Sequence, residues 1–215
     1  MKCHLCNGET EEFLVKNKKF EQLYYRCKNC SFIFVEEDAL LKSSEELERY
    51  QMHNNSVEDP MYREYFEKFI EYAFKDLEKV EDILDYGSGP QPVLASVLKG
   101  KGYKVDIYDK YFSPEKIYKD RKYDAVCSTE VIEHIYYPME VLKELVGCVK
   151  KGGYLIIMTN FHKDSWEQFR NWWYIQDPTH TVFYSLKTFE FIEKEFKLKI
   201  LKNNGKNIIV FKKED

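Results

Sequence analysis

The sequence has no long apolar run, no strong excess of charge of one sign, and little glycine or proline. No apolar stretch approaches the roughly 20 residues that a membrane helix needs. The 33 basic and 37 acidic residues give a net charge of −4, so composition alone indicates no broad surface for nucleic acid. There is no internal repeat and no low-complexity segment. The length of 215 residues allows one full domain and a small appendage.

Glycine is scarce, with nine residues, yet two glycines stand close together in residues 83–90, ILDYGSGP. An aliphatic run that ends at Asp85 and breaks at Gly87 and Gly89 predicts a strand, a tight turn and a helix. At such a turn the backbone can approach a ligand too closely for any Cβ to be tolerated. A dinucleotide-binding fingerprint would need a third glycine where this chain has Pro92. The pattern therefore argues against a dinucleotide ligand.

A second strand follows about twenty residues later, in residues 102–109. It ends at Asp109, and a carboxylate at this spacing suits the two hydroxyls of a ribose. Asp106 is less suited, because side chains alternate along a strand and this one should point elsewhere.

Residues 123–134 indicate another strand followed by a loop. Apolar residues then recur at helical spacing in residues 142–149, and this helix is expected to stop at Gly152, where a left-handed cap is possible. Residues 154–159 form a short apolar run bounded by turn residues. This pattern predicts a strand that is covered on both faces.

In this order and spacing, the segments resemble the motifs of the class I S-adenosylmethionine-dependent methyltransferases. The run YDAVCSTEVIEH is similar to the family's F-D-x-I-x-x-x-x-V-h-x-H motif. The run LVGCVKKGGYLII is similar to the motif that leads into the family's fifth strand. The resemblance covers Ile83 to about Val210. It implies an α/β fold with a doubly wound, mostly parallel seven-stranded sheet and a final antiparallel hairpin strand, and residues 203–205, NNG, supply a hairpin signal.

The resemblance also implies the cofactor contacts. In the family, the first acid and glycines hold the amino-acid end of S-adenosylmethionine, and the second acid holds the ribose. Three readings stay open: the first acid could only cap its turn, the second could be solvated, and the histidine could make a structural hydrogen bond. The expected cofactor-binding residues are Asp85, Gly87, Gly89, Asp109, Thr129 and His134.

Four of the six cysteines form two pairs with C-x-x-C spacing, separated by twenty residues. Two such knuckles supply a tetrahedron of thiolates, which predicts a structural zinc ion with no open coordination position. His4 could replace one ligand. Two disulfides would suit a secreted protein, but no signal peptide begins the chain, so we expect a soluble, cytoplasmic protein with no membrane partner. The expected zinc ligands are Cys3, Cys6, Cys27 and Cys30.

The motifs predict three regions. Residues 1–35 form a zinc ribbon, too short to fold without metal. Residues 36–60 form a polar linker in which Ser43 begins a helix. Residues 61–215 form the methyltransferase domain, opened by an amphipathic helix from Met61 to Val80.

The least regular part of this domain is residues 161–184, which hold all three tryptophans. Ligands of open α/β sheets bind beyond the carboxyl ends of the strands, where this segment leaves the core. Its aromatic residues could bind an apolar or ring-shaped acceptor, or pack on the sheet edge as a hydrophobic lid. A base is needed if the acceptor must lose a proton, and His180 is the first candidate, followed by His162 and Glu130.

These observations favour methyl transfer to a small-molecule acceptor, such as a sugar or an intermediate of cell-envelope or natural-product synthesis. One alternative is an RNA methyltransferase that docks its substrate through the ribbon. The near-neutral balance of six basic and four acidic residues in positions 1–35 argues against nucleic acid as a partner. Another alternative is a cofactor-binding partner subunit without catalysis. The sequence leaves the oligomeric state open.

Overall fold

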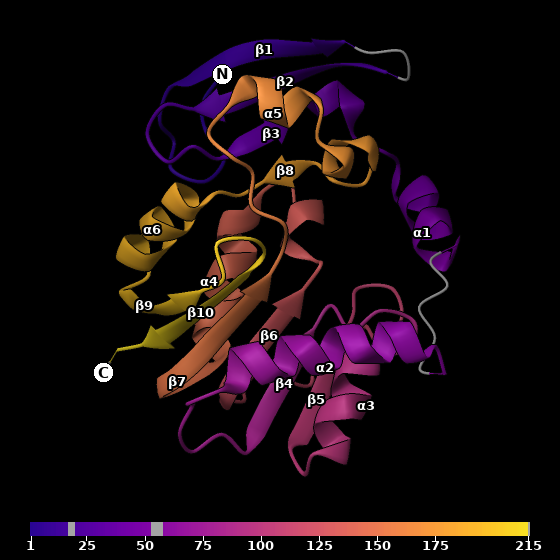
Figure 1. Ribbon diagram of the computed structural model, residues 1–215, viewed down its shortest axis with the longest axis vertical. Helices are drawn as coiled ribbons and strands as arrows, with labels where there is room; N and C mark the ends of the chain where they lie inside the picture. Colours follow the sequence, from indigo (N-terminus) through magenta and orange to yellow (C-terminus); the bar gives the residue numbers. More distant parts are fainter. Residues whose placement is uncertain (17–19, 53–57, 215) are drawn as a thin grey trace.

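The computed structural model describes residues 1–16, 20–52 and 58–214, which form a large sheet and a smaller one above it in the view of Figure 1. The large sheet has the strand order β5-β4-β6-β7-β10-β9. Its strands are β4 (Asp82–Tyr86), β5 (Lys104–Tyr108), β6 (Tyr123–Thr129), β7 (Val149–Met158), β9 (Leu198–Asn203) and β10 (Ile208–Lys213).

The four strands β4 to β7 are parallel, and the closing pair β9 and β10 is antiparallel, as predicted. The expected seventh strand is not formed by the described residues, which give this sheet six strands. Immediately after β5, the backbone N–H groups of Tyr111 and Phe112 donate to the Asp109 carboxylate. These bonds curl the chain, so residues 110–122 turn instead of extending along the sheet edge.

Helices cover both faces of the large sheet. Helices α2 (Pro60–Phe74) and α3 (Val93–Gly100) pack on one face, and α4 (Pro138–Cys148) and α6 (Leu186–Glu195) on the other. Adjacent residues of β4 alternate between the two cores, with Ile83 in the first and Leu84 in the second. The layers confirm the expected α/β fold with a mostly parallel sheet.

Two predicted helix ends were wrong. The helix expected to reach Val80 ends at Phe74, because Asp76 and Lys79 take left-handed backbone angles that an α-helix cannot continue through. The helix expected to stop at Gly152 ends at Cys148, where β7 begins directly. Glycine is still required in this strand, since a Cβ at Gly153 would lie 2.8 Å from the carbonyl oxygen of Asp124.

The smaller sheet has the order β1-β2-β3-β8. Strands β1 (Thr10–Lys16), β2 (Glu21–Cys27) and β3 (Ile33–Val35) belong to the predicted ribbon, whereas β8 (Val182–Phe183) belongs to the predicted methyltransferase domain. The ribbon therefore shares a sheet, and also a hydrophobic core, with the carboxyl-terminal half of the chain.

The remaining elements connect the two sheets. The 3-10 helix η1 (Glu37–Ala39) and helix α1 (Ser43–Met52) lie in the predicted linker, of which residues 53–57 fall outside the described residues. Helix α5 (Trp166–Arg170) and the 3-10 helix η3 (Trp173–Gln176) follow β7, and a further 3-10 helix, η2 (Ile132–His134), follows β6. Over the described ranges, every helix is too short or too polar to cross a bilayer.

Candidate active site and cysteine cluster

The glycine turn after β4 has the backbone conformation that its sequence predicts. Gly87 has a φ of +85°, and a Cβ placed there would lie 2.2 Å from Cγ2 of Val131. The N–H groups of Gly87 and Ser88 both donate to the carbonyl oxygen of Tyr108, at 2.7 and 3.0 Å, which ties the turn to β5. Only glycine fits at position 87, because any side chain would collide with the neighbouring loop.

Asp85 precedes this turn and is 1% exposed. Among the described residues, neither of its carboxylate oxygens has a hydrogen-bond partner, and the hydroxyls of Ser88 and Ser128 nearby are also unpartnered. Burial and the charge of Asp109 raise the pKa of Asp85 to about 7, although the nearby backbone N–H of Ala95 acts to lower it. A buried carboxylate without a hydrogen-bond partner is a site for a cation, and the ammonium group of a bound amino-acid moiety would satisfy it.

Asp109 has a second task beside the ribose contact that the sequence suggests. Its Oδ2 accepts from the N–H of Gly89 at 2.9 Å, and its Oδ1 accepts from the N–H groups of Tyr111 and Phe112. The half-buried carboxylate thus shapes the glycine turn and, with three of its roughly four lone pairs used, keeps about one for a ribose hydroxyl. Its role toward a ribose stays a prediction.

The loop after β6 carries an acidic cluster that the sequence reading found only in part. Glu130 has a φ of +53°, a strained conformation for a non-glycine residue. Its carboxylate accepts from the hydroxyl of Tyr65 at 3.0 Å, and its Oε2 lies 3.3 Å from the hydroxyl oxygen of Tyr174. That Tyr174 hydroxyl donates its one proton over the shorter distance of 2.6 Å to the fully buried Glu133. Thr129, at the end of β6, is buried beside this loop.

The two carboxylates share one polar environment, so protonation of one depends on the other. Burial and the charge of Glu133 raise the pKa of Glu130 to about 8. Burial also raises the pKa of Glu133. Glu133 is the residue that sequence reasoning missed; its position three residues after Glu130 is the signal that could have pointed to a pair. Tyr65 and Tyr174 could not be found in this way, because they lie far away in the chain.

His180 lies against this cluster. Its Nδ1 is 2.8 Å from the carbonyl oxygen of Tyr174 and must carry a proton there, which leaves Nε2 as the acceptor in the neutral ring. The His180 ring centroid lies 4.0 Å from that of Tyr174 and 4.9 Å from that of His134. The Nδ1 of His134 lies 2.9 Å from the carbonyl oxygen of Thr179. Ligand atoms of Glu133, His134 and His180 lie within 4.8 Å of one another.

His162 occupies a different environment. The buried ring has Nε2 at 2.9 Å from the carbonyl oxygen of Ser31 and Nδ1 at 3.1 Å from that of Lys163. Burial lowers the pKa of His162, so the neutral ring is favoured. Its position joins the end of β7 to the amino-terminal ribbon, and a catalytic role for it stays a prediction.

A pocket of about 510 Å³ opens beyond the carboxyl end of β7. Tyr65, Trp172 and Trp173 supply much of its aromatic wall, and Lys163 and Lys206 are its only charged lining residues within the described chain. Tyr65 connects it to the acidic cluster, because its hydroxyl donates to Glu130. A pocket with aromatic walls is therefore present here, and its binding of an acceptor stays a prediction. Part of the tryptophan segment packs on the ribbon and not on the large sheet.

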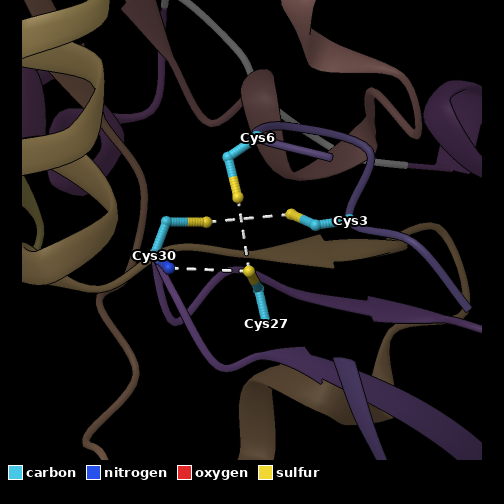
Figure 2. Close-up of side chains that lie close together, drawn as sticks. All are labelled: Cys3, Cys6, Cys27 and Cys30. Atoms are coloured by element: carbon cyan, nitrogen blue, oxygen red, sulfur yellow. Dashed lines mark hydrogen bonds between the residues drawn. The ribbon is translucent and has the colours of Figure 1, made fainter. Parts of the chain in front are cut away.

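The four paired cysteines form one cluster (Figure 2). The sulfurs of Cys6 and Cys27 are 3.3 Å apart and those of Cys3 and Cys30 are 3.7 Å apart, so no disulfide joins them. A tetrahedron with metal–sulfur bonds of about 2.3 Å has sulfur–sulfur edges of about 3.8 Å, close to these separations. A Cβ at Gly8 would lie 3.1 Å from the Cys6 sulfur, so the backbone wraps closely around the cluster.

Backbone N–H groups point toward the sulfurs, as thiolate ligands require. Those of Asn29 and Cys30 approach the Cys27 sulfur at 3.4 and 3.5 Å, and that of Leu5 approaches Cys3. The hydrogen bond from Cys30 lowers the pKa of the Cys3 thiol to about 6. His4 does not join the cluster; its ring packs against that of Phe34, with the centroids 4.0 Å apart.

Residues 59–203 match the family described as Methyltransferase domain. A Ubiquinone biosynthesis O-methyltransferase from Rickettsia felis is 29% identical over 123 residues, covering 47% of this chain and 50% of that protein. The chain thus spans about half the length of this curated relative. An S-adenosylmethionine-dependent methyltransferase from Archaeoglobus fulgidus superposes with a TM-score of 0.53 at 16% identity, over 78% of this chain and 99% of its own. The mitomycin 7-O-methyltransferase MmcR also gives 0.53, at 13% identity, over 79% and 67%.

At these identities, the solved structures show a shared fold. The family match covers more than half of the chain and includes the glycine turn, Asp109 and the Glu130 loop. The chain therefore belongs to the methyltransferase domain family.

Proposed function

We propose that this methyltransferase methylates a hydroxyl group of a small aromatic acceptor that carries a negative charge. The observation that carries the proposal is the hydrogen bond from Tyr65 to Glu130, at 3.0 Å. Through it, a pocket with aromatic walls adjoins a half-buried carboxylate whose pKa is raised to about 8. Such a carboxylate is a suitable proton acceptor for a hydroxyl nucleophile.

The lining of the pocket supports the choice of acceptor. Trp172 and Trp173 offer flat apolar surfaces to a ring. Lys163 and Lys206 bring positive charge, and neither forms an ion pair with any described carboxylate. In a protein of net charge −4, two unpaired lysines at one pocket favour an anionic ligand. The printed names of the Rickettsia relative and of MmcR, both O-methyltransferases, favour a hydroxyl acceptor.

The cofactor site follows the predicted residues. When bound, S-adenosylmethionine supplies a methyl group on a positively charged sulfur, ready for in-line displacement. Asp85 would hold the ammonium group, Gly87 and Gly89 would let the backbone approach it closely, and Asp109 would accept from a ribose hydroxyl. Thr129 and His134 would line the remaining wall. The unpartnered carboxylate of Asp85 and the absence of space for a Cβ at Gly87 fit this arrangement.

Proton transfer would run through Tyr65. The Tyr65 oxygen would accept the hydroxyl proton of the acceptor as the acceptor oxygen becomes the nucleophile. The Tyr65 proton would pass in turn to Oε1 of Glu130, where it would remain. Glu133 and Tyr174 hold the pair in place, and the aromatic walls exclude water. His180 remains the competing base.

The cysteine cluster completes the proposal. We assign it a single zinc ion held by Cys3, Cys6, Cys27 and Cys30, because their sulfurs have the separations of a tetrahedral site. Four thiolates leave no position for a substrate, so the ion would be structural. Small-molecule acceptors and not nucleic acids are the proposed partners.

The test is a methylation assay that detects S-adenosylhomocysteine and the mass of the product. Hydroxybenzoates would be compared with the matched uncharged hydroxybenzamides. We expect methyl ethers, with kcat/KM at least tenfold higher for the benzoates, and a rate that rises with pH through about 8 as Glu130 ionises. Glu130→Gln should lower kcat by about 10²- to 10⁴-fold and remove this rise. Glu140→Gln, at an exposed position on α4, is the control. Methylation of RNA alone would contradict the proposal.

A further inference from the structure

The amino-terminal ribbon is physically continuous with the segment that lines the acceptor pocket. Strand β3 pairs with β8, matching Ile33 with Phe183 and Phe34 with Val182. The N–H of Val35 donates to the carbonyl oxygen of Thr181 and extends this pairing. The ribbon sheet is therefore completed by a strand from the far end of the catalytic region.

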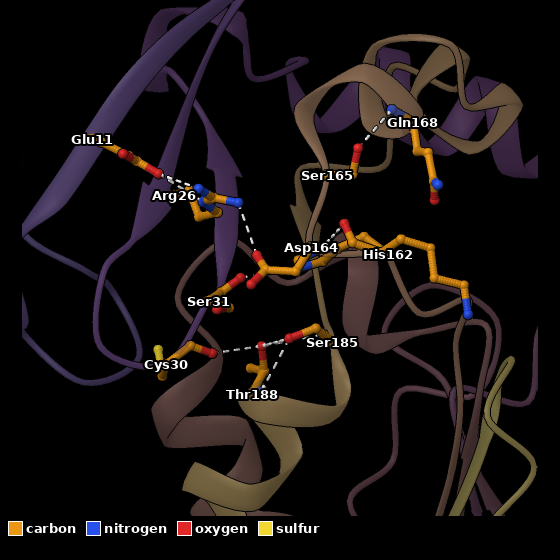
Figure 3. A network of polar contacts seen from close by, with 11 residues as sticks. Glu11, Arg26, Cys30, Ser31, His162, Asp164, Ser165, Gln168, Ser185 and Thr188 are labelled. Carbon is orange, nitrogen blue, oxygen red and sulfur yellow. Dashed lines mark hydrogen bonds and ion pairs between the residues drawn. The ribbon is translucent and has the colours of Figure 1, made fainter.

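The second cysteine knuckle bonds directly to that region (Figure 3). The carbonyl oxygen of Cys30 accepts from the hydroxyl of Thr188 at 2.9 Å, and that of Ser31 accepts from Nε2 of His162 at 2.9 Å. Ser31 has a left-handed φ of +57°, and its N–H donates to the carbonyl oxygen of Cys27. The direction of both accepting carbonyls thus depends on the tight knuckle turn, and metal coordination would hold that turn closed.

A second contact starts from Arg26, the residue before Cys27. Its guanidinium bonds to Glu11 within the ribbon and to the carboxylate of Asp164 at 2.8 Å. The same guanidinium lies 3.8 Å from the ring centroid of Trp166, and the ring centroids of Phe13 and Trp166 are 3.5 Å apart. Arg26 therefore fixes the start of α5 against the ribbon.

Helix α5 connects this contact with the ribbon to the acceptor pocket. Phe169 lies on α5 and packs against Phe13 and Tyr24 of the ribbon, with ring centroids 5.6 and 5.2 Å apart. Phe169 also lines the acceptor pocket, together with Lys163 and Gln168 from the same segment. One short stretch of chain, residues 162–173, thus connects the cysteine cluster to the acceptor pocket.

We propose that the metal-bound ribbon is a positioning element of the acceptor site. By holding residues 162–173 in place, the metal controls the binding of the acceptor, while the glycine turn keeps its affinity for the cofactor. The turn is held by its own bonds to Tyr108 and Asp109. The proposal rests on the proposed function in assigning the pocket to the acceptor, but the mechanical coupling can be measured without any acceptor.

Hydrogen–deuterium exchange of the full chain tests the coupling. The protein would be compared before and after stoichiometric metal release by a mercurial reagent and chelator, with metal content measured in both samples. We expect exchange to increase at least tenfold in residues 162–173 as well as in the ribbon, and to stay within twofold in residues 83–89. Unchanged exchange in residues 162–173 after confirmed metal loss would overturn the proposal, and the proposed function would stand.

Arg26→Gln tests the same coupling with the metal in place. We expect normal metal content, unchanged affinity for S-adenosylmethionine, a rise of about three- to tenfold in KM for a hydroxybenzoate, and little change in kcat. Arg26→Lys should raise KM less than Arg26→Gln does, because the charge toward Asp164 remains. Lys28→Gln, whose ammonium group is mostly exposed and 3.9 Å from Glu9, is the matched control and should behave as wild type. Equal KM values for Arg26→Gln and Lys28→Gln would contradict the positioning role.

Discussion

The sharpest prediction concerns Asp85, whose carboxylate is buried without hydrogen-bond donors among the described residues. Its folded-state pKa of about 7 lies above the ordinary value of 3.8. Between about pH 4 and pH 7 the folded state therefore binds a proton that the unfolded state has lost, and the free energy of unfolding must fall as the pH rises through this window. A shift of this size corresponds to up to about 4 kcal/mol, reached by about pH 8.

Asp85→Asn keeps the shape of the side chain and removes the buried charge. We expect the variant without ligand to match the wild type near pH 4 and to exceed its stability at pH 8 by a few kcal/mol, measured by urea denaturation. The same change should weaken binding of S-adenosylmethionine by about 10- to 100-fold, because an ion pair to the ammonium group is lost. Titration calorimetry in two buffers of different ionisation enthalpy should show proton release on binding to the wild type near pH 7, and none with the variant.

Asp124→Asn is the control with the opposite sign. Burial acts to raise the pKa of Asp124, but the N–H groups of Asp82 and Glu81 and the ammonium group of Lys150 lower it overall. Loss of this carboxylate should destabilise the protein at pH 8. If Asp85→Asn also destabilised the ligand-free protein at pH 8, the assignment of Asp85 as an unpaired buried charge would be refuted.

Three further variants test separate parts of the site. Gly87→Ala should lower the affinity for S-adenosylmethionine at least tenfold by calorimetry, because the new Cβ would lie 2.2 Å from Val131. Gly205→Ala is the control: no atom lies within 4 Å of its new Cβ, so the affinity should not change. Metal analysis should find one zinc ion per wild-type chain, and Cys27→Ser should remove it and lower the melting temperature while cofactor binding persists; disulfides found by thiol titration would contradict this. His180→Ala should lower turnover strongly with cofactor affinity nearly unchanged, whereas loss of cofactor binding would show a structural role.

The sequence by itself determined the parts of the protein whose constraints are local. Gly87 is needed because its own φ is positive and its neighbour leaves no space, and both features arise within one turn. The C-x-x-C knuckles converge because two intervening residues suffice to turn the backbone. The order of strands and helices followed for the same reason, since periodicity and turn residues act over short stretches of chain.

The tertiary structure decided what depends on residues distant in the chain. The pairing of β3 with β8 joins the ribbon to the segment that follows β7, and no local pattern could reveal it, because paired residues such as Ile33 and Phe183 stand far apart in the chain. Glu130 has its raised pKa because folding buries its carboxylate beside the charge of Glu133. The large sheet has six strands among the described residues because bonds to Asp109 curl the chain after β5. Burial and long-range pairing are properties of the folded chain, so they are determined only in three dimensions.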